Sequence, residues 1–238
     1  MIHYIYTAFY YASILGAPLV RPVWFEFSEQ PKFYKVESQF MFGDAMLVAP
    51  KLATPSKALE KMHLQEVTFT LPEGIKWYNY YNKKVETVVG IPVTRNLPDL
   101  EQAVFIKAGS IIPILLHDEC MALMACFHNK IRLDVYLDDF LEASGSLFAD
   151  DGVSFKYATE NSFAMVKFTF KENDVMYLKS EVVSKGSYEF PATQTVDTVA
   201  IYGWTTKPLA VLNNGIYCEF NYNDGALVVS LPDGVSPG

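Results

Sequence analysis

From Pro50 onward, short apolar runs alternate with turn residues, and this pattern restricts the fold more than any other feature of the sequence. Strands of β-sandwiches have this length and spacing, whereas amphipathic helices need longer runs with a period near 3.6 residues. The first six runs predict a proximal β-sandwich over residues 51–116. They are 66–71, 77–81, 84–89, 91–95, 103–107 and 110–115.

A second series of runs predicts a distal β-sandwich over residues 117–238. The 15 Tyr and 17 Phe of the sequence also favour strands over helices. Residues 117–129 fit either a helical turn or a loop, and both alternatives stay open. The expected strands are 131–137, 146–148, 154–157, 164–171, 175–183, 198–202, 208–212, 217–222 and 226–231.

The first fifty residues have a different character. Residues 3–15 contain no helix breaker, and Gly16 with Pro18 beyond it is a typical helix stop. Apolar side chains go nearly all the way round this helix, so we expect neighbours outside the chain to cover part of it. The apolar runs in 18–27 and 39–50 suit strands buried on both faces, as in a parallel barrel. Residues 1–50 therefore predict the tail of an α/β domain.

The charge of the chain excludes several classes of partner. The formal net charge is −8 without a basic stripe, so we expect neither nucleic acid nor an anionic membrane to bind. No window of about 18 apolar residues occurs, which predicts no membrane-spanning helix. A neutral ligand fits this composition better.

Four blocks of sequence stand in a recognisable order. Residues 16–27 read Gly-Ala-Pro-Leu-Val-Arg-Pro-Val-Trp-Phe-Glu-Phe, and 39–50 read Gln-Phe-Met-Phe-Gly-Asp-Ala-Met-Leu-Val-Ala-Pro. Val-Phe-Ile-Lys-Ala-Gly-Ser-Ile-Ile-Pro follows at 104–113, and Leu-Phe-Ala-Asp-Asp-Gly-Val-Ser-Phe-Lys-Tyr at 147–157. Together they resemble the C-terminal portion of family 31 glycoside hydrolases of the α-glucosidase type. The resemblance implies that 1–50 is the C-terminal end of a (β/α)₈ catalytic barrel, followed by the two sandwiches.

The same resemblance implies a retaining α-glucosidase, in which one Asp attacks the anomeric carbon and a second acts as acid and then base. In the family, the nucleophile lies in a Trp-x-Asp-Met-x-Glu block upstream of the helix that 3–15 resembles, and this sequence has no such block. The resemblance therefore assigns no catalytic, substrate-binding or metal-binding residue and no cofactor. It implies two partners: the N-terminal catalytic portion of the same enzyme, and an α-glucoside or N-glycan substrate.

Within the family, residues 154–157 and the Phe-rich run 166–170 are similar to the glucosidase II catalytic subunit. This similarity implies the lumen of the endoplasmic reticulum or another secretory compartment, with a glucosidase II β-subunit as a further partner. The last residues, 231–238, are not a Lys-Asp-Glu-Leu retention signal, so retention would depend on that partner.

A second hypothesis comes from another functional class. A truncated paralogue without catalysis would act as a carbohydrate-binding or scaffold module through its two sandwiches. Independent stability of the chain would favour it, whereas the uncovered apolar faces of 3–15 and 39–50 predict aggregation of the isolated chain.

Several charged residues invite a functional interpretation. Arg21 follows an apolar run, where a guanidinium could clamp sugar hydroxyls, but its surroundings favour a buried ion pair with Glu26 or Asp44. The acidic residues of the second half allow a Ca²⁺ site, although Asp-Asp-Gly is also a good turn. Adjacent carboxylates point opposite ways on an extended chain, so they cannot form a catalytic pair. These acidic residues are Asp138, Asp139, Asp150 and Asp151.

Histidines, cysteines and aromatic residues predict no metal centre. The histidines are scattered and the cysteines are an odd set without ligand spacing, so we interpret them as ordinary core or surface residues and as buried or free thiols. The aromatic residues would suit a sugar-stacking platform, but strand cores use such residues more often. The residues concerned are His3, His63, His117 and His128; Cys120, Cys126 and Cys218; and Trp24, Trp77, Trp204, Tyr78, Tyr80 and Tyr81.

Overall fold

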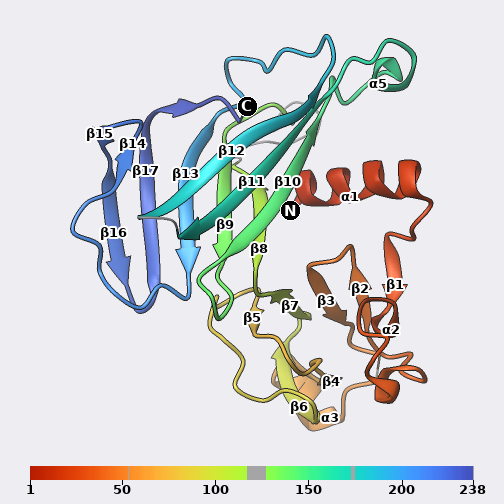
Figure 1. The fold of residues 1–238 in the computed structure, drawn as a ribbon. Coiled ribbons are helices and arrows are strands. Elements are labelled where there is room, and N and C mark those ends of the chain that lie inside the picture. Colours follow the sequence, from red (N-terminus) through yellow and green to blue (C-terminus); the bar gives the residue numbers. More distant parts are fainter. Residues whose placement is uncertain (53, 117–126, 173–174, 238) are drawn as a thin grey trace. The chain divides into compact units, whose positions relative to one another are not determined.

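The computed structural model describes residues 1–52, 54–116, 127–172 and 175–237, and it confirms a mostly β chain (Figure 1). The chain divides into two compact units: unit 1 comprises Met1–Leu15 and Gly109–Gly238, and unit 2 comprises Gly16–Ala108. The division expected at residues 50 and 116 stays a prediction. None of the described helices has the length and hydropathy of a membrane-crossing segment.

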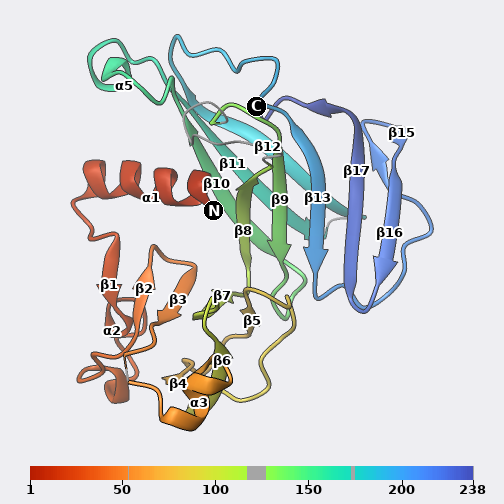
Figure 2. The same cartoon turned by 180° about the vertical axis from the view of Figure 1, so that it is seen from behind.

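Unit 1 is an eight-stranded mixed sheet that curls into a half-barrel, with one long helix beside it (Figures 1 and 2). Its elements are α1 (Ile2–Leu15), β8 (Ser110–Leu115), β9 (Ile131–Tyr136), β10 (Ala143–Ala149), α5 (Lys156–Thr159), β11 (Ala164–Glu172), β12 (Met176–Lys185), β13 (Val196–Tyr202), β14 (Leu212–Asn213), β15 (Ile216–Tyr217), β16 (Glu219–Asn223) and β17 (Ala226–Val235). The strand order is β12-β11-β10-β8-β9-β13-β17-β16, and the small β14-β15 hairpin is separate. Only two of the neighbouring pairs in this sheet, β10 with β8 and β13 with β9, run parallel.

The core of unit 1 comes from alternate residues of these strands, because every second side chain of a strand points to the same face. Leu133, Val135, Phe168, Ile201 and Leu227 are buried in one hydrophobic cluster. The predicted helix over 3–15 is confirmed as α1, and it packs against β8 and β10 within this unit.

Unit 2 has two antiparallel sheets around a second core. Its elements are β1 (Val20–Pro22), α2 (Val23–Glu26), the 3₁₀ helix η1 (Pro31–Phe33), β2 (Phe40–Phe42), β3 (Met46–Ala49), α3 (Lys57–Lys61), β4 (Leu64–Thr70), β5 (Trp77–Asn79), β6 (Pro92–Pro98) and β7 (Ala103–Lys107). The sheets have the orders β1-β2-β3-β7-β5 and β4-β6. Phe69 of β4 and Phe105 of β7 meet with ring centroids 4.5 Å apart, and Trp77 is fully buried in the same core.

The strand directions in unit 2 differ from the expectation of parallel barrel strands. Residues 39–50 form β2 and β3, which pair antiparallel with each other, and β3 pairs antiparallel with β7. Residues 18–27 form β1 and then turn into the short helix α2. The three-residue connection over 43–45 allows only antiparallel pairing of β2 with β3, and the interpretation of 39–50 as one buried strand missed this hairpin.

Three predicted strands are wrong for local reasons. Residues 84–89 form only an isolated bridge between Val85 and Tyr78. Residues 154–157 form a turn that leads into α5, because Asp151 binds the backbone and hydroxyl of Ser154. Residues 208–212 are a loop up to the start of β14.

Candidate functional site

Helix α1 and the loop after β10 meet in a group of polar side chains, which we call the α1–β10 cluster: His3, Tyr6, His128, Asp150 and Tyr188. Residues three and four apart lie on one face of a helix, so His3, Tyr6, Thr7 and Tyr10 face the sheet together. The hydroxyl of Thr7 donates to the carbonyl of His3 at 2.8 Å and accepts the backbone N–H of Phe148 at 2.9 Å. Tyr10 stacks on Phe148, with ring centroids 4.0 Å apart.

Asp150 is the centre of this cluster. Its side chain is buried, and its carboxylate accepts the hydroxyl of Tyr6 at 2.9 and 3.0 Å and the backbone N–H of Gly152 at 2.8 Å. Burial raises the pKa of Asp150, although these two donors oppose the rise. Burial, followed by the hydrogen bond to Asp150, raises the pKa of Tyr6 above its usual value. The pair therefore combines a neutral phenol with a carboxylate that burial makes easier to protonate.

Asp151 points to a different set of partners. Its carboxylate accepts the Ser154 hydroxyl at 2.6 Å and the backbone N–H groups of Val153 and Ser154 at 3.0 and 2.9 Å. These donors, the Ser154 hydroxyl first, lower the pKa of Asp151 to about 2. The expectation that the two adjacent carboxylates diverge is confirmed. They form a turn and do not flank a common bond.

His3 and His128 both contact the ring of Phe127. The Phe127 ring centroid is 5.1 Å from that of His3 and 5.4 Å from that of His128. Among the described residues, neither ring nitrogen of the fully buried His3 has a hydrogen-bond partner. Desolvation by burial is the main cause that lowers the pKa of His3 to about 4. The sequence interpretation of scattered histidines missed this proximity, which arises only when α1 packs on the sheet.

Tyr188 links the second histidine to the end of the sheet. Its hydroxyl lies 3.4 Å from Nδ1 of His128 and donates to the side-chain oxygen of the buried Gln194 at 3.1 Å. Burial raises the pKa of Tyr188. Tyr6, Thr7 and Tyr188 were not singled out from the sequence. The helical spacing of Tyr6 from His3 and Tyr10 was the available signal for the first of them.

The acidic residues do not assemble as metal ligands. Asp138 accepts the backbone N–H groups of Phe140 and Glu142, both at 2.8 Å, as a turn residue does. Over the part of the chain that the structure describes, no three His, Cys, Asp or Glu side chains gather with metal-ligand geometry. Asp150 and Asp151 already accept the donors named above, so the Asp-Asp-Gly motif acts as a turn.

Arg21 forms the structural ion pair that the sequence suggested. Its guanidinium lies 2.8 Å from the Glu26 carboxylate, and Nε donates to the carbonyl of Gly43 at 3.2 Å. The guanidinium also lies over the Phe25 ring, 5.1 Å from its centroid. With these three partners inside unit 2, the side chain positions the turn from β1 into α2.

The remaining candidates divide between core and surface. Trp77 and Tyr78 are strand core, and the Trp77 indole donates to the carbonyl of Pro72 at 3.0 Å. Trp24, Tyr81 and His63 are exposed, and His63 lies 3.2 Å from an Asp99 oxygen. Cys218 is a buried free thiol, whereas His117, Cys120 and Cys126 lie outside the described residues. Tyr80 contacts Tyr81 edge-on and Trp204 packs against Phe170, each within its own unit.

Asp150 and Asp151 have structural roles in this geometry. The α1–β10 cluster joins a helix at residues 2–15 to loops more than a hundred residues later, and both its Asp150 carboxylate and the neighbouring Asp151 carboxylate accept donors of the same unit. A retaining glycosidase needs two carboxyl groups about 5 Å apart that both face the sugar. Asp150 and Asp151 do not meet that requirement.

Comparison with known proteins relates this chain to one enzyme family. Residues 16–112 match the glycosyl hydrolase family 31 C-terminal domain. The chain is 30% identical to lysosomal alpha-glucosidase of Rattus norvegicus over 98% of its own length and 25% of the relative. It is 31% identical to neutral alpha-glucosidase AB of Sus scrofa over 87% of its length and 20% of the relative. The chain therefore spans about a quarter of the curated relatives it matches, and the two identities do not separate the subgroups.

Solved structures support the fold. The catalytic-subunit complex described as ER glucosidase II with the binding domain of its regulatory subunit matches with a TM-score of 0.77 and 20% identity, over 98% of this chain and 26% of that chain. The Flavobacterium johnsoniae GH31 dextranase FjDex31A bound to glucose matches with a TM-score of 0.75 and 22% identity, over 97% and 29%.

Proposed function

Because the chain carries a glycoside hydrolase family 31 C-terminal domain and its relatives are α-glucosidases, we propose that it is the C-terminal part of a retaining α-glucosidase. The complete enzyme removes terminal α-linked glucose from oligosaccharides or N-glycans. This chain supports a catalytic barrel, and the active-site Asp residues of that barrel lie on an N-terminal portion outside residues 1–238.

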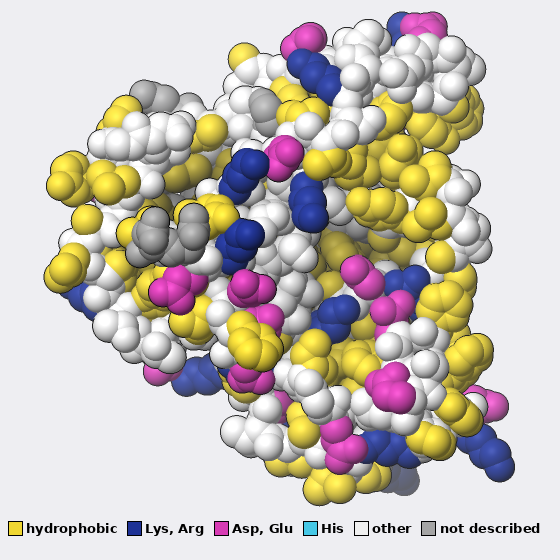
Figure 3. Space-filling model, in the orientation of Figure 1, with side chains coloured by type: hydrophobic (Ala, Val, Ile, Leu, Met, Phe, Trp, Pro, Cys, Tyr) yellow, Lys and Arg dark blue, Asp and Glu magenta, His cyan; other side chains and the backbone are white. Residues whose placement is uncertain are grey.

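Exposed apolar side chains of α1 are the observation that carries this proposal. Phe9 lies opposite the buried face of the helix and is 56% exposed, and Ile14 and Leu15 in the last turn are 55 and 70% exposed. Hydrophobic side chains gather over this helix in Figure 3. Burying an apolar side chain is worth about 1.5–3 kcal/mol, so a helix with this composition is stabilised by a second partner. The upstream three quarters of the relatives' length supply such a partner.

The relatives support a proposal for the compartment and for a further partner. One solved relative is an ER enzyme with a regulatory subunit, and another glucosidase II structure is alpha3-Glc2-bound. We extend both to this protein: the endoplasmic reticulum lumen or another secretory compartment, and a glucosidase II β-subunit. A pull-down of this protein from native lysate that returns no β-subunit would count against the glucosidase II subgroup. The α-glucosidase proposal would still stand.

Peptide mapping of the native protein tests the main proposal. Antibody against 226–235 should recover a polypeptide, or a complex, that also yields a Trp-x-Asp-Met-x-Glu peptide and hydrolyses an α-glucoside. Recovery of this chain alone, as a cooperatively melting monomer that binds maltose, would support the alternative of an inert carbohydrate-binding or scaffold module.

A further inference from the structure

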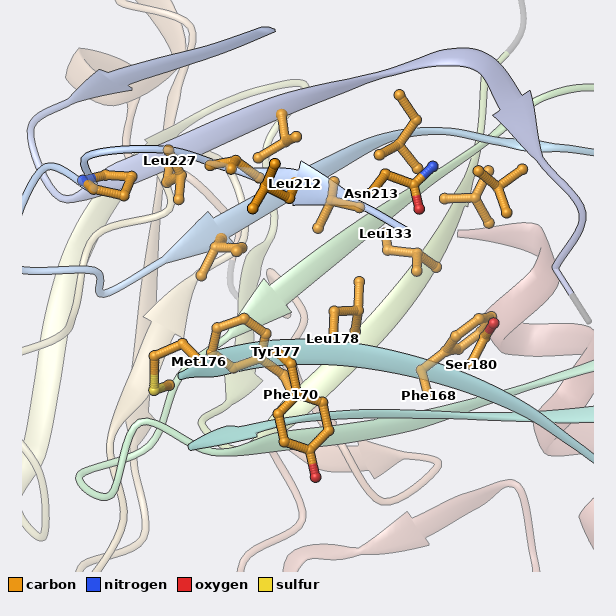
Figure 4. A pocket seen from close by; sticks show the side chains of 18 of the residues that line it. Leu133, Phe168, Phe170, Met176, Tyr177, Leu178, Ser180, Leu212, Asn213 and Leu227 are labelled. Atoms are coloured by element: carbon orange, nitrogen blue, oxygen red, sulfur yellow. The ribbon is translucent and has the colours of Figure 1, made fainter. Parts of the chain in front are cut away.

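A cavity of about 610 Å³ lies inside the curled sheet of unit 1. Figure 4 shows Leu212 and Asn213 on one side of the cavity and Phe168 and Leu178 on the other. Pro208 and residues 210–213 form part of its wall, so the cavity is more than the open face of a sheet. Small-molecule sites are typically about 300–1,000 Å³, and this volume falls in that range.

The strand pattern makes the interior apolar. Leu133 of β9, Ile201 of β13 and Leu227 of β17 line the cavity, and each is less than 7% exposed. Their side chains come from alternate positions that point to the concave face of the sheet. This wall is rigid because its residues belong to paired strands of one hydrophobic core.

Polar groups in the lining are few. No charged side chain lines the cavity among the described residues, and Ser180 and Asn213 are two of the polar ones. Trp204 also lines the cavity, but its indole N–H donates to the carbonyl of Thr206 and is therefore already paired. A ligand inside would find hydrophobic contact over most of its surface, and the polar side chains of the lining are Tyr177, Ser180, Asn213 and Ser236.

A sugar does not fit this chemistry. A pyranose carries hydroxyls around its ring, and each one left without a partner in an apolar site costs about 1–3 kcal/mol. An uncharged aromatic or alicyclic molecule, with at most one or two polar groups, loses no such hydrogen bonds. It would also gain contact with aromatic side chains such as Phe168 and Trp204.

We propose that the cavity inside the half-barrel of unit 1 is a binding site for a small, uncharged and largely apolar molecule. It lies apart from the α1–β10 cluster, and it does not depend on the glucosidase proposal. The site gives the protein a second binding function, for which the ligand is recognised by shape and hydrophobic contact.

The test uses the protein at its native length and N-phenyl-1-naphthylamine, an uncharged probe whose emission rises in apolar surroundings. We expect saturable binding at one site, displacement by naphthalene and no displacement by maltose. Two substitutions fill the cavity from different walls: Ser180→Trp on β12 and Ala210→Phe in the loop, where both residues are exposed at the lining. Each should weaken probe binding by about tenfold or more, which corresponds to about 1.4 kcal/mol.

Ser184→Trp is the matched control, because Ser184 is exposed on the same strand and does not line the cavity. It should bind the probe like the unmodified protein. Thermal melting identifies any variant that does not fold. If one of the two cavity-filling variants does not fold, probe binding to the other variant tests the proposal. Binding that never saturates, displacement by maltose, or unchanged affinity in a folded filling variant would overturn the proposal.

Discussion

The hydroxyl of Tyr6 donates to both oxygens of the Asp150 carboxylate, at 2.9 and 3.0 Å, across 144 positions of the chain. This contact joins the first helix to the turn after β10 within unit 1. Asp150 also accepts the N–H of Gly152, so one buried carboxylate holds both the helix and the turn. The Asp-Asp-Gly motif is therefore a structural element with a long-range partner.

Removing the Tyr6 hydroxyl tests how much this hydrogen bond contributes to stability. Tyr6→Phe leaves the buried Asp150 with one donor fewer, which should cost about 1–3 kcal/mol of unfolding free energy. Urea denaturation of the mutant measures it. Tyr11→Phe is the control, since the Tyr11 hydroxyl contacts the sulfur of Met165 at 3.7 Å, and a thioether is a weak acceptor. It should change stability by less than about 0.5 kcal/mol.

A double-mutant cycle with Asp150→Asn checks that the cost belongs to the pair. If Tyr6 and Asp150 act through their contact, the double mutant should be less destabilised than the sum of the single mutants. Additive effects would mean that the two residues stabilise the unit independently. That result would contradict the proposal that their hydrogen bond holds α1 to the turn after β10.

The Asp-Asp-Gly turn should matter for stability and leave the chemistry intact. In the complete enzyme, Asp150→Asn and Asp151→Asn should lower the melting temperature or yield, while kcat per folded molecule stays within about twofold. A turn carries no transition-state charge, whereas a catalytic carboxylate contributes several orders of magnitude. Steady-state kinetics on an α-glucoside, normalised with a mechanism-based inhibitor, measure this. A hundredfold loss of kcat at unchanged melting temperature would place part of the active site here.

The buried His3 predicts a dependence of stability on pH. Its pKa is about 4 in the folded chain against 6.5 for the exposed group, so the unfolded chain binds more protons between these values. Unfolding free energy should be unaffected by His3 above pH 6.5 and should fall as the pH drops toward 4, by about 3 kcal/mol at most.

Chemical denaturation at a series of pH values gives the profile. His3→Phe should flatten the part of it between pH 6.5 and 4, because Phe fills the space without a titrating group. An unaltered slope in His3→Phe would show that other groups cause the loss.

Local patterns predicted some elements of this fold well. The breaker-free run became α1, and β7 and β8 occupy the predicted residues 103–107 and 110–115. Those segments are determined by their own composition. The Tyr6–Asp150 contact depends on residues far away in the chain, and a periodicity of two or 3.6 residues carries no information about it. The antiparallel pairing of β2 with β3 is local, because only residues 43–45 join the two strands.

In the candidate site too, contacts between residues close in sequence could be predicted and contacts between distant residues could not. The ion pair of Arg21 with Glu26 could be predicted because the two residues are only five apart. The approach of His3 to Phe127 could not, since it exists only after the helix packs on the sheet. The turn at Ser154 resembled a strand because its apolar neighbours dominated the pattern, while the Asp151 side chain decided the conformation.

The exposed apolar residues of α1 give a test of the proposed assembly. In the complete enzyme, Leu15→Gln should lower the melting temperature and the yield, because Leu15 would lose hydrophobic contact worth about 1.5–3 kcal/mol when fully buried. In the isolated chain the same substitution should leave the unfolding free energy within about 0.5 kcal/mol of the unmodified value and should reduce self-association, since Leu15 is 70% exposed there.

Leu209→Gln is the matched control at a fully exposed loop position of unit 1, and it should have little effect in either protein. Thermal melting and sedimentation velocity of the four variants measure both quantities. Equal effects of the two substitutions in the complete enzyme would show that Leu15 remains exposed there, and the proposal that this chain supports a catalytic barrel would fail.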